Sequence, residues 1–263
     1  MRSSPTALLS RRHRFLISTC LALVIALAWG YLFLLDSRTS SSMRADAMMA
    51  ALGMPMTPRW TTADVLLTFL MWAVMMVGMM AGTAAPVLLL FADARTERTG
   101  RGVPLAVLMF GLGYIAVWVG FSVGATLVQW RLHEAALLSV AMSASTPRLA
   151  GAILIAAGAY QLTPLKFACL TQCRHPLGFL MTHWREGNIG AFRMGLGHGT
   201  HCLGCCWALM CVLFVTGVMN LAWVAALSVF VLFEKVGPRG VAVSRLAGTT
   251  MIVVGILFLA GTA

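Results

Sequence analysis

Five of the seven cysteines lie within 38 residues of one another, and histidines lie among them. If residues 190–211 form a helix, His198, Cys202 and Cys205 fall at positions i, i+4 and i+7, on one face. Thiolate and imidazole at one-turn spacing can close around a soft metal ion. A second cysteine pair lies four residues apart upstream, so two segments can contribute ligands. The predicted metal-binding residues of this cluster are Cys169, Cys173, Cys202, Cys205, Cys206, His198 and His201.

A simpler interpretation remains open, because a free cysteine also packs well as a small apolar side chain. We prefer that interpretation for the isolated Cys20 and for Cys211. His198 and His201 could instead face lipid headgroups, and the histidines of the polar stretch before them are expected to be solvated. Cys-x2-Cys spacing also serves redox chemistry, so the motif alone does not decide the function.

A methionine stripe follows Phe69, where Met71, Met75 and Met79 occupy one third of a helix circumference. Thioethers are soft, neutral ligands that suit Cu(I). Ten of the 18 methionines fall between residues 43 and 80. Because a methionine stripe more often only packs, the stripe is a weaker indication of copper than the cysteines.

The composition indicates a membrane protein. Hydrophobic residues make up 60% of the 263 positions and charged residues only 10%, whereas soluble domains carry about 25% charged residues. The long uncharged stretches are apolar all round, which is typical of spanning helices rather than of barrel strands. The sequence therefore predicts an all-α, polytopic transmembrane helix bundle embedded in the lipid bilayer.

We expect about seven spans, with six as the alternative. Residues 1–64 form an N-terminal span and a Met-rich outer loop, and residues 65–263 form the helical membrane domain. A break near Gly217 and Asn220 divides the uncharged run 203–233, which is too long for a single crossing. The expected spans are 15–35, 65–91, 103–130, 149–163, two within 203–233, and 246–260.

The basic residues predict the orientation of these spans. With a cytoplasmic N-terminus, 14 of the 19 lysines and arginines fall in cytoplasmic segments, as the positive-inside rule requires. Seven spans then place the C-terminus outside. The net charge of +11 is spread over short loops with no interleaved aromatic residues, so no nucleic-acid partner is expected.

Several stretches resemble a bacterial family of uncharacterised integral membrane proteins that is described as predicted metal-binding. They cover roughly residues 65–260, and the most distinctive is Cys202-Leu-Gly-Cys-Cys-Trp-Ala-Leu-Met210. The others are Met71–Met76, Ala85–Ala92, Tyr160–Cys173 and Phe233–Lys235. The family commonly has a proline after the paired methionines, where this chain has Ala81-Gly82. The resemblance implies metal binding and the bacterial cytoplasmic (inner) membrane, and it supplies no reaction.

Together these features favour a protein that binds a soft metal ion, copper rather than zinc, for transport or for delivery to a metal chaperone or metalloenzyme partner. A membrane thiol-disulfide oxidoreductase that uses the paired cysteines is the alternative, and a permease for another solute is a third hypothesis. The residues favour a binding or transport protein over an enzyme. Glu234 is expected at the membrane interface beside Lys235, with a relay role as the alternative.

Overall fold

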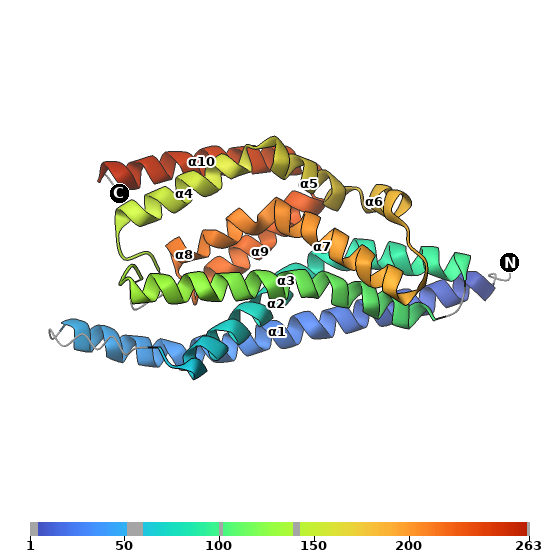
Figure 1. Cartoon of the computed structure of the whole chain (residues 1–263), viewed down its shortest axis with the longest axis horizontal. Coiled ribbons are helices and arrows are strands. Elements are labelled where there is room, and N and C mark those ends of the chain that lie inside the picture. The colour runs from blue at the N-terminus through green and yellow to red at the C-terminus, as the bar shows by residue number, and fades with distance from the viewer. Residues whose placement is uncertain (1–4, 52–59, 100–101, 139–142, 262–263) are drawn as a thin grey trace.

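The computed structural model describes residues 5–51, 60–99, 102–138 and 143–261. Within these ranges every extended element is a helix, and the only β pairing is an isolated bridge between Leu138 and Ala144. The predicted all-α class is therefore confirmed. In chain order (Figure 1) the helices are α1 (Pro5–Ala51), α2 (Thr62–Arg98), α3 (Val103–Glu134), α4 (Pro147–Gln161), α5 (Pro164–Arg174), α6 (Pro176–His183), α7 (Gly187–Cys211), α8 (Leu213–Thr216), α9 (Leu221–Val236) and α10 (Gly240–Ala260).

The long helices run roughly side by side, and the two ends of the chain lie at opposite ends of the bundle (Figure 1). The most extensive helix contacts are those of α3 with α7, α4 with α10, α1 with α2 and α2 with α3. Helix α5 packs on α7, and α9 contacts α2, α5 and α7. Helix α7 is thus covered on several sides, and its side chains form much of the interior.

Five helices are individually long and apolar enough to cross a membrane, namely α1, α2, α3, α7 with its continuation α8, and α10. Helices α4 and α5 qualify together as a sixth, bent by 62° at their junction. The seventh predicted span corresponds to α9, whose 16 residues extend only about 24 Å. Every predicted span therefore coincides with a helix, although α9 is short for a complete crossing.

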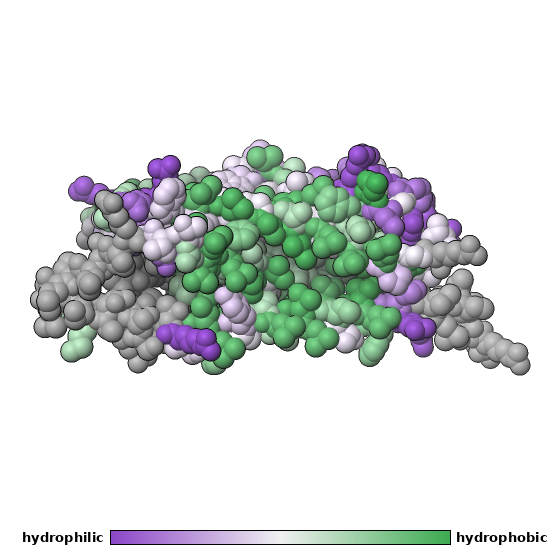
Figure 2. Space-filling view, turned by 60° about the horizontal axis from the view of Figure 1, so that its bottom comes forward, coloured by the Kyte–Doolittle hydropathy of each residue, from purple (hydrophilic) through white to green (hydrophobic). Residues whose placement is uncertain are grey.

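The outer surface of the bundle supports a membrane location. A broad apolar band lies between two hydrophilic ends (Figure 2), and many large apolar side chains are exposed, for example Leu27, Leu66 and Leu246. Soluble proteins rarely expose contiguous apolar patches of this kind. Lipid rather than water is the solvent that such a surface requires.

Two expected loops are helical. Helix α1 continues to Ala51, beyond the predicted loop start at residue 36, because Gly53 and Pro55 are the first strong helix breakers there. Met48 is exposed, and Met54 and Met56 lie outside the described residues. The polar stretch after Pro164 forms α5, α6 and the first part of α7.

The predicted break in residues 203–233 is confirmed. Gly217 has φ +96°, a backbone conformation that glycine adopts most easily. Asn220 then caps α9, because its side-chain oxygen accepts a hydrogen bond from the Trp223 amide.

Glycine lets α3 and α7 approach closely. A Cβ atom added at Gly195 would overlap the backbone of Phe110, and one added at Gly113 would overlap the backbone of Phe192. Gly195 and Gly199 both face α3, so the Gly195-x3-Gly199 spacing lets the two backbones come close together. This contact fixes the position of α7, which carries three of the cysteines.

Candidate metal centre

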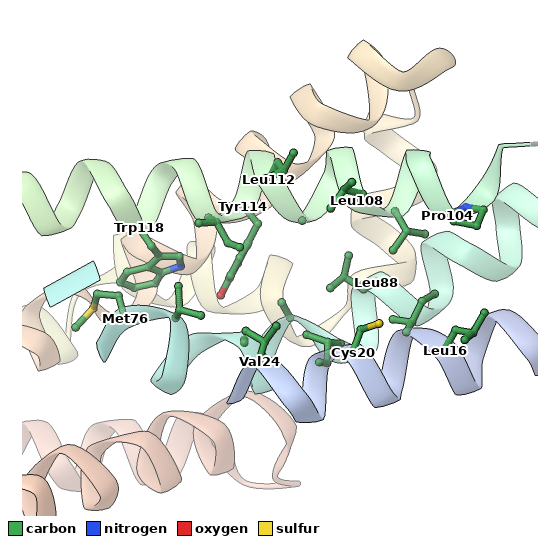
Figure 3. Close-up of a pocket in the computed structure, with 18 residues that line it drawn as sticks. Leu16, Cys20, Val24, Met76, Leu88, Pro104, Leu108, Leu112, Tyr114 and Trp118 are labelled. Atoms are coloured by element: carbon green, nitrogen blue, oxygen red, sulfur yellow. The ribbon is translucent and has the colours of Figure 1, made fainter. Parts of the chain in front are cut away.

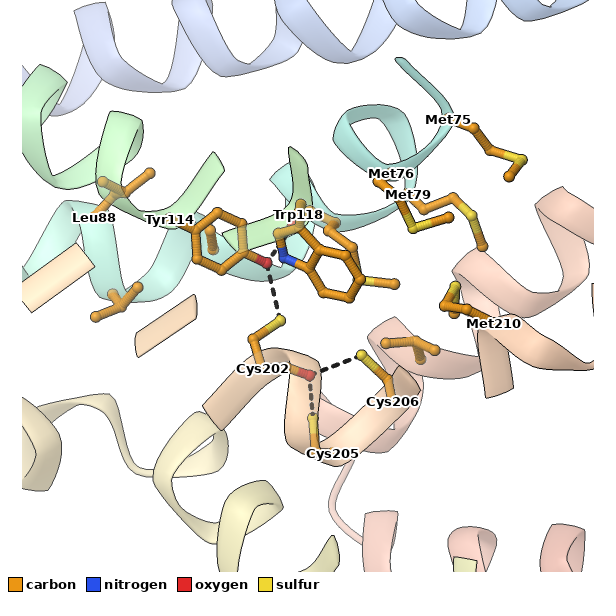
Figure 4. Packing of buried hydrophobic residues seen from close by; sticks show 14 of the residues in the cluster. Met75, Met76, Met79, Leu88, Tyr114, Trp118, Cys202, Cys205, Cys206 and Met210 are labelled. Carbon is orange, nitrogen blue, oxygen red and sulfur yellow. Dashed lines mark hydrogen bonds between the residues drawn. The ribbon is translucent and has the colours of Figure 1, made fainter. Parts of the chain in front are cut away.

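Helix α7 buries three thiols on its interior face. Cys202, Cys205 and Cys206 have at most 1% of their surface exposed. The thiols of Cys205 and Cys206 donate to the carbonyl oxygen of Cys202 at 3.1 and 2.8 Å, as Figure 4 shows. The helical spacing therefore gathers the three thiols on one side of α7.

Helix α5 brings a fourth thiol to the same place. The Sγ atoms of Cys173 and Cys205 are 3.9 Å apart, and Cys173 also interacts with Cys202. Two thiolates that share an ion at about 2.3 Å, with a tetrahedral or trigonal angle, lie roughly 3.8–4.0 Å apart. The Cys173–Cys205 separation fits a shared metal ion.

Cys169 lies one turn earlier on α5 and against a different part of α7. A Cβ atom added at Gly204 would come within 2.7 Å of the Cys169 Sγ atom, so glycine makes room for this thiol. Cys169 is half-buried and lies at the edge of the thiol cluster. We use the name thiol centre for Cys173, Cys202, Cys205 and Cys206.

Two residues that sequence reasoning did not select touch Cys202. The Lys235 ammonium on α9 donates to the Cys202 Sγ atom at 2.8 Å, and the Tyr114 hydroxyl on α3 lies 3.0 Å from it. Lys235 also donates to the Thr83 hydroxyl at 3.3 Å. None of the ion pairs found among the described residues includes Lys235. A thiolate at Cys202 would therefore balance the charge of this buried lysine.

Glu234, expected beside Lys235 at the membrane interface, is fully buried among the helices rather than exposed at the surface of the bundle. Its Oε1 atom accepts a hydrogen bond from Lys166 on α5 at 2.5 Å, and neither side chain is exposed. Lys166 also donates to Gln161. An acid inside a bundle needs such a partner because desolvation of an isolated charge is costly. The two residues are 68 positions apart in the sequence, so no local pattern predicts the pair.

The two predicted histidine ligands lie on the α7 turns before the thiol centre. His198 is 3% exposed and packs near the rings of Phe110, Tyr114 and Phe179. His201 is half-buried, and its Nδ1 atom is 2.7 Å from the Gly197 carbonyl oxygen. Neither histidine hydrogen-bonds to a cysteine of the thiol centre in the described part of the chain.

The thiol centre is not a finished coordination shell. Among the described residues, no three His, Cys, Asp or Glu side chains have the mutual geometry of a preformed metal site. The Cys205 and Cys206 thiols point toward a backbone carbonyl, so rotation of these side chains is needed before all four sulfurs can face one ion.

Comparison with known sequences decides the family. The sequence model of the PpoB2 family, described as a copper chaperone, matches residues 69–258. This chain belongs to the PpoB2 copper chaperone family. The match contains every predicted ligand and both Lys235 and Tyr114, whereas α1 precedes it. No curated protein and no solved structure is detectably similar to the chain.

PpoB2 membership confirms the predicted link to copper and favours metal handling over the exchange of thiols and disulfides. It also gives context to the methionine stripe. Met71, Met75 and Met79 are all buried, and so are Met76 and Met80 on the other side of α2. All five belong to the same buried cluster as the three α7 cysteines. Met75, Met76 and Met79 are labelled in Figure 4 together with Met210 of α7.

A separate apolar cavity of about 300 Å³ lies between α1, α2 and α3 (Figure 3). Tyr114 and Trp118 form part of its wall, and among the described residues that line it Cys20 and Met76 carry sulfur. Because Tyr114 also touches Cys202, one aromatic side chain separates this cavity from the thiol centre.

Proposed function

We propose that this protein is a polytopic copper chaperone of the bacterial cytoplasmic membrane, which holds Cu(I) in the thiol centre and delivers it to a partner metalloprotein. The observation that carries the proposal is the meeting of α5, α7 and α9 at one buried point. There, Cys173, Cys205 and the Lys235–Cys202 pair come together. Copper is the cargo in this proposal, and no catalytic step is involved.

The charge of the site is compatible with Cu(I). Two thiolates and one Cu(I) ion carry a net charge of −1, and the buried Lys235 ammonium brings the total to zero. Soft thiolates also prefer Cu(I) to hard cations.

The ion pairs at one end of the bundle support a cytoplasmic N-terminus. Arg14 of α1 pairs with Asp93 of α2 at 3.4 Å, and Arg95 of α2 pairs with Glu186 at 3.0 Å. This end gathers basic residues from the start of α1, the end of α2 and the link before α7. Basic segments of this kind stay on the cytoplasmic face.

The test is the copper content of the purified protein in detergent. Wild-type protein should retain copper close to stoichiometrically, and a Cys202→Ser, Cys205→Ser, Cys206→Ser variant should lose most of it, because a serine hydroxyl is a poor ligand for Cu(I). Cys211→Ser is the matched control on the same helix and should keep its copper. A triple variant with undiminished copper would contradict the proposal.

A further inference from the structure

Three histidines, one at the end of α6 and two in the middle of α7, surround Phe179 of α6. The ring centroids of His183, His198 and His201 lie 4.9, 5.2 and 5.9 Å from that of Phe179. His183 and His201 are 6.3 Å apart. His183 is exposed, His201 is half-buried and His198 is buried, so the three rings form a graded series from solvent toward the interior.

Hydrogen bonds fix which nitrogen of the two outer rings is free. The Nδ1 atom of His201 lies 2.7 Å from the Gly197 carbonyl oxygen, which can only accept, so Nδ1 carries the proton. The His183 Nδ1 atom lies 3.2 Å from the Phe179 carbonyl oxygen and 2.8 Å from the Thr182 hydroxyl. That hydroxyl itself donates to backbone carbonyls. In both neutral rings the lone pair is therefore on Nε2.

This arrangement is the one that proteins use for metal-binding histidines. A ligating imidazole usually donates its other N–H to a carbonyl, which fixes the ring and raises its basicity. Two imidazoles that share an ion at about 2.0 Å from each nitrogen have ring centroids at most roughly 6.3 Å apart. The observed separation of 6.3 Å is within reach of a shared two-coordinate ion once the two Nε2 atoms face each other.

The third ring, that of His198, lies farther inside the bundle. The Nδ1 atom of His198 is one of the buried polar atoms without a hydrogen-bond partner in the described residues. His198 also lies one helical turn before Cys202 on the buried face of α7. An unpaired nitrogen in the interior is costly, and a transient ligand would satisfy it.

We propose that His183 and His201 form a two-coordinate copper(I) loading site, distinct from the thiol centre, from which the ion passes by way of His198 to Cys202. The inference rests on the proposed function, because it assumes that the thiol centre receives copper. His183 borders a cavity of about 400 Å³ that Arg185 and Arg193 also line. The positive charge of these arginines favours copper delivered as an anionic Cu(I)–thiolate complex over the free ion.

The exchange at this site is balanced. Each imidazole nitrogen displaces one thiolate of the incoming complex, both thiolates leave with their electron pairs, and copper remains in the +1 state. No proton is released at the two histidines, since their Nε2 atoms already carry lone pairs.

The experiment uses the full-length protein in detergent and Cu(I) in excess glutathione as the probe. Loading of the thiol centre is followed by the ultraviolet thiolate-to-copper absorption. The His183→Ala, His201→Ala variant should load about tenfold more slowly while reaching the same final copper content. That equal end point also shows that the variant is folded. His175→Ala, which removes an exposed histidine of the same segment, should load at the wild-type rate.

A second measurement isolates the site. The Cys173→Ser, Cys202→Ser, Cys205→Ser, Cys206→Ser variant should retain weakly bound copper with two nitrogen neighbours in its X-ray absorption spectrum. Adding the two histidine substitutions should abolish this copper. Loading of the histidine variant at the wild-type rate, or residual copper that is unaffected by the histidines, would overturn the inference. Equal copper in the wild type and the cysteine variant would instead overturn the proposed function and the transfer step together.

Discussion

At the scale of single residues, the thiol centre combines ligands that could be predicted from the sequence with contacting residues that could not. Cys202, Cys205 and Cys206 are recognisable from their spacing, and Cys173 from its pairing with Cys169. Lys235 and Tyr114 are 33 and 88 residues from Cys202, and although Lys235 lies in the Phe233–Lys235 stretch, nothing in the sequence pairs either residue with this cysteine. Only the packing of α3 and α9 on α7 shows that they touch the same sulfur.

Removal of one partner of the buried Lys166–Glu234 pair should destabilise the protein strongly. Lys166→Met leaves the Glu234 carboxylate buried without its cation, so we expect a loss of about 3–5 kcal/mol in the free energy of unfolding. The double variant Lys166→Met, Glu234→Leu removes both charges and should recover most of that loss. Unfolding in detergent, followed by circular dichroism, measures both values.

A surface pair supplies the control for this prediction. Arg14 and Asp93 are much more exposed, with 56% and 24% of their side-chain surface accessible. Asp93→Asn should therefore cost about 1 kcal/mol or less. Equal losses for Asp93→Asn and Lys166→Met would mean that burial does not set the energy of these pairs.

At the scale of helices, the contact between α3 and α7 positions the site. Gly195 allows the two backbones to approach, and the turns that follow it carry His198, His201 and Cys202. Small residues at four-residue spacing, as in Gly195-x3-Gly199, are typical of a close helix contact. They do not say which helix is the partner, because several apolar spans of similar composition are available.

Gly195→Ala should separate α3 from α7. The added methyl group overlaps the backbone of Phe110, and we expect a loss of about 1–3 kcal/mol together with weaker copper retention. Both follow from displacement of Tyr114 relative to Cys202. Thermal unfolding and metal analysis of the same preparation provide the measurement.

Gly120→Ala is the matched control on α3, since no atom lies within 4 Å of a Cβ atom added there. Alanine favours the helix over glycine by up to about 1 kcal/mol, so this variant should be at least as stable as the wild type. A destabilised Gly120→Ala variant would show that helix contacts are not what distinguishes the two positions.

The positions of the helices could be predicted from hydropathy, whereas their ends could not. The helix over 36–51 was missed because its serines, arginines and aspartates are polar, and polarity alone does not stop a helix. The short helices α5 and α6 were missed for a similar reason. Each begins at a proline, which is a favourable first residue of a helix as well as a breaker, so the same signal has two meanings.

At the scale of the whole molecule, the surface and the chain ends define the relation to the membrane. The apolar band lies between two hydrophilic ends (Figure 2), and the termini are at opposite ends of the bundle (Figure 1). A chain whose termini lie on opposite sides of the membrane crosses it an odd number of times. The short α9 decides the count, because without it the chain would cross six times.

Reporter fusions test this topology. A reporter that is active only in the cytoplasm should work at the N-terminus and fail at the C-terminus, while a reporter for the opposite side should show the reverse. The basic residues near the start of α1 are the physical reason for the expected orientation. Cytoplasmic signals from both termini would establish an even number of crossings and contradict the seven-span arrangement.

The pairing of α4 with α10 has a consequence for release of the cargo. These two helices pack mainly on each other, yet α4 continues into α5, which holds Cys173, and α10 follows directly on α9, which holds Lys235. Arg174, the last residue of α5, donates hydrogen bonds to the carbonyl oxygens of Glu234 and Gly237, and so ties the end of α5 to the end of α9. A tilt of α4 and α10 relative to α7 would therefore move the Cys173 sulfur and the Lys235 ammonium away from Cys202 together. A partner that docks on these two helices, which contain no ligand, could thereby release the copper.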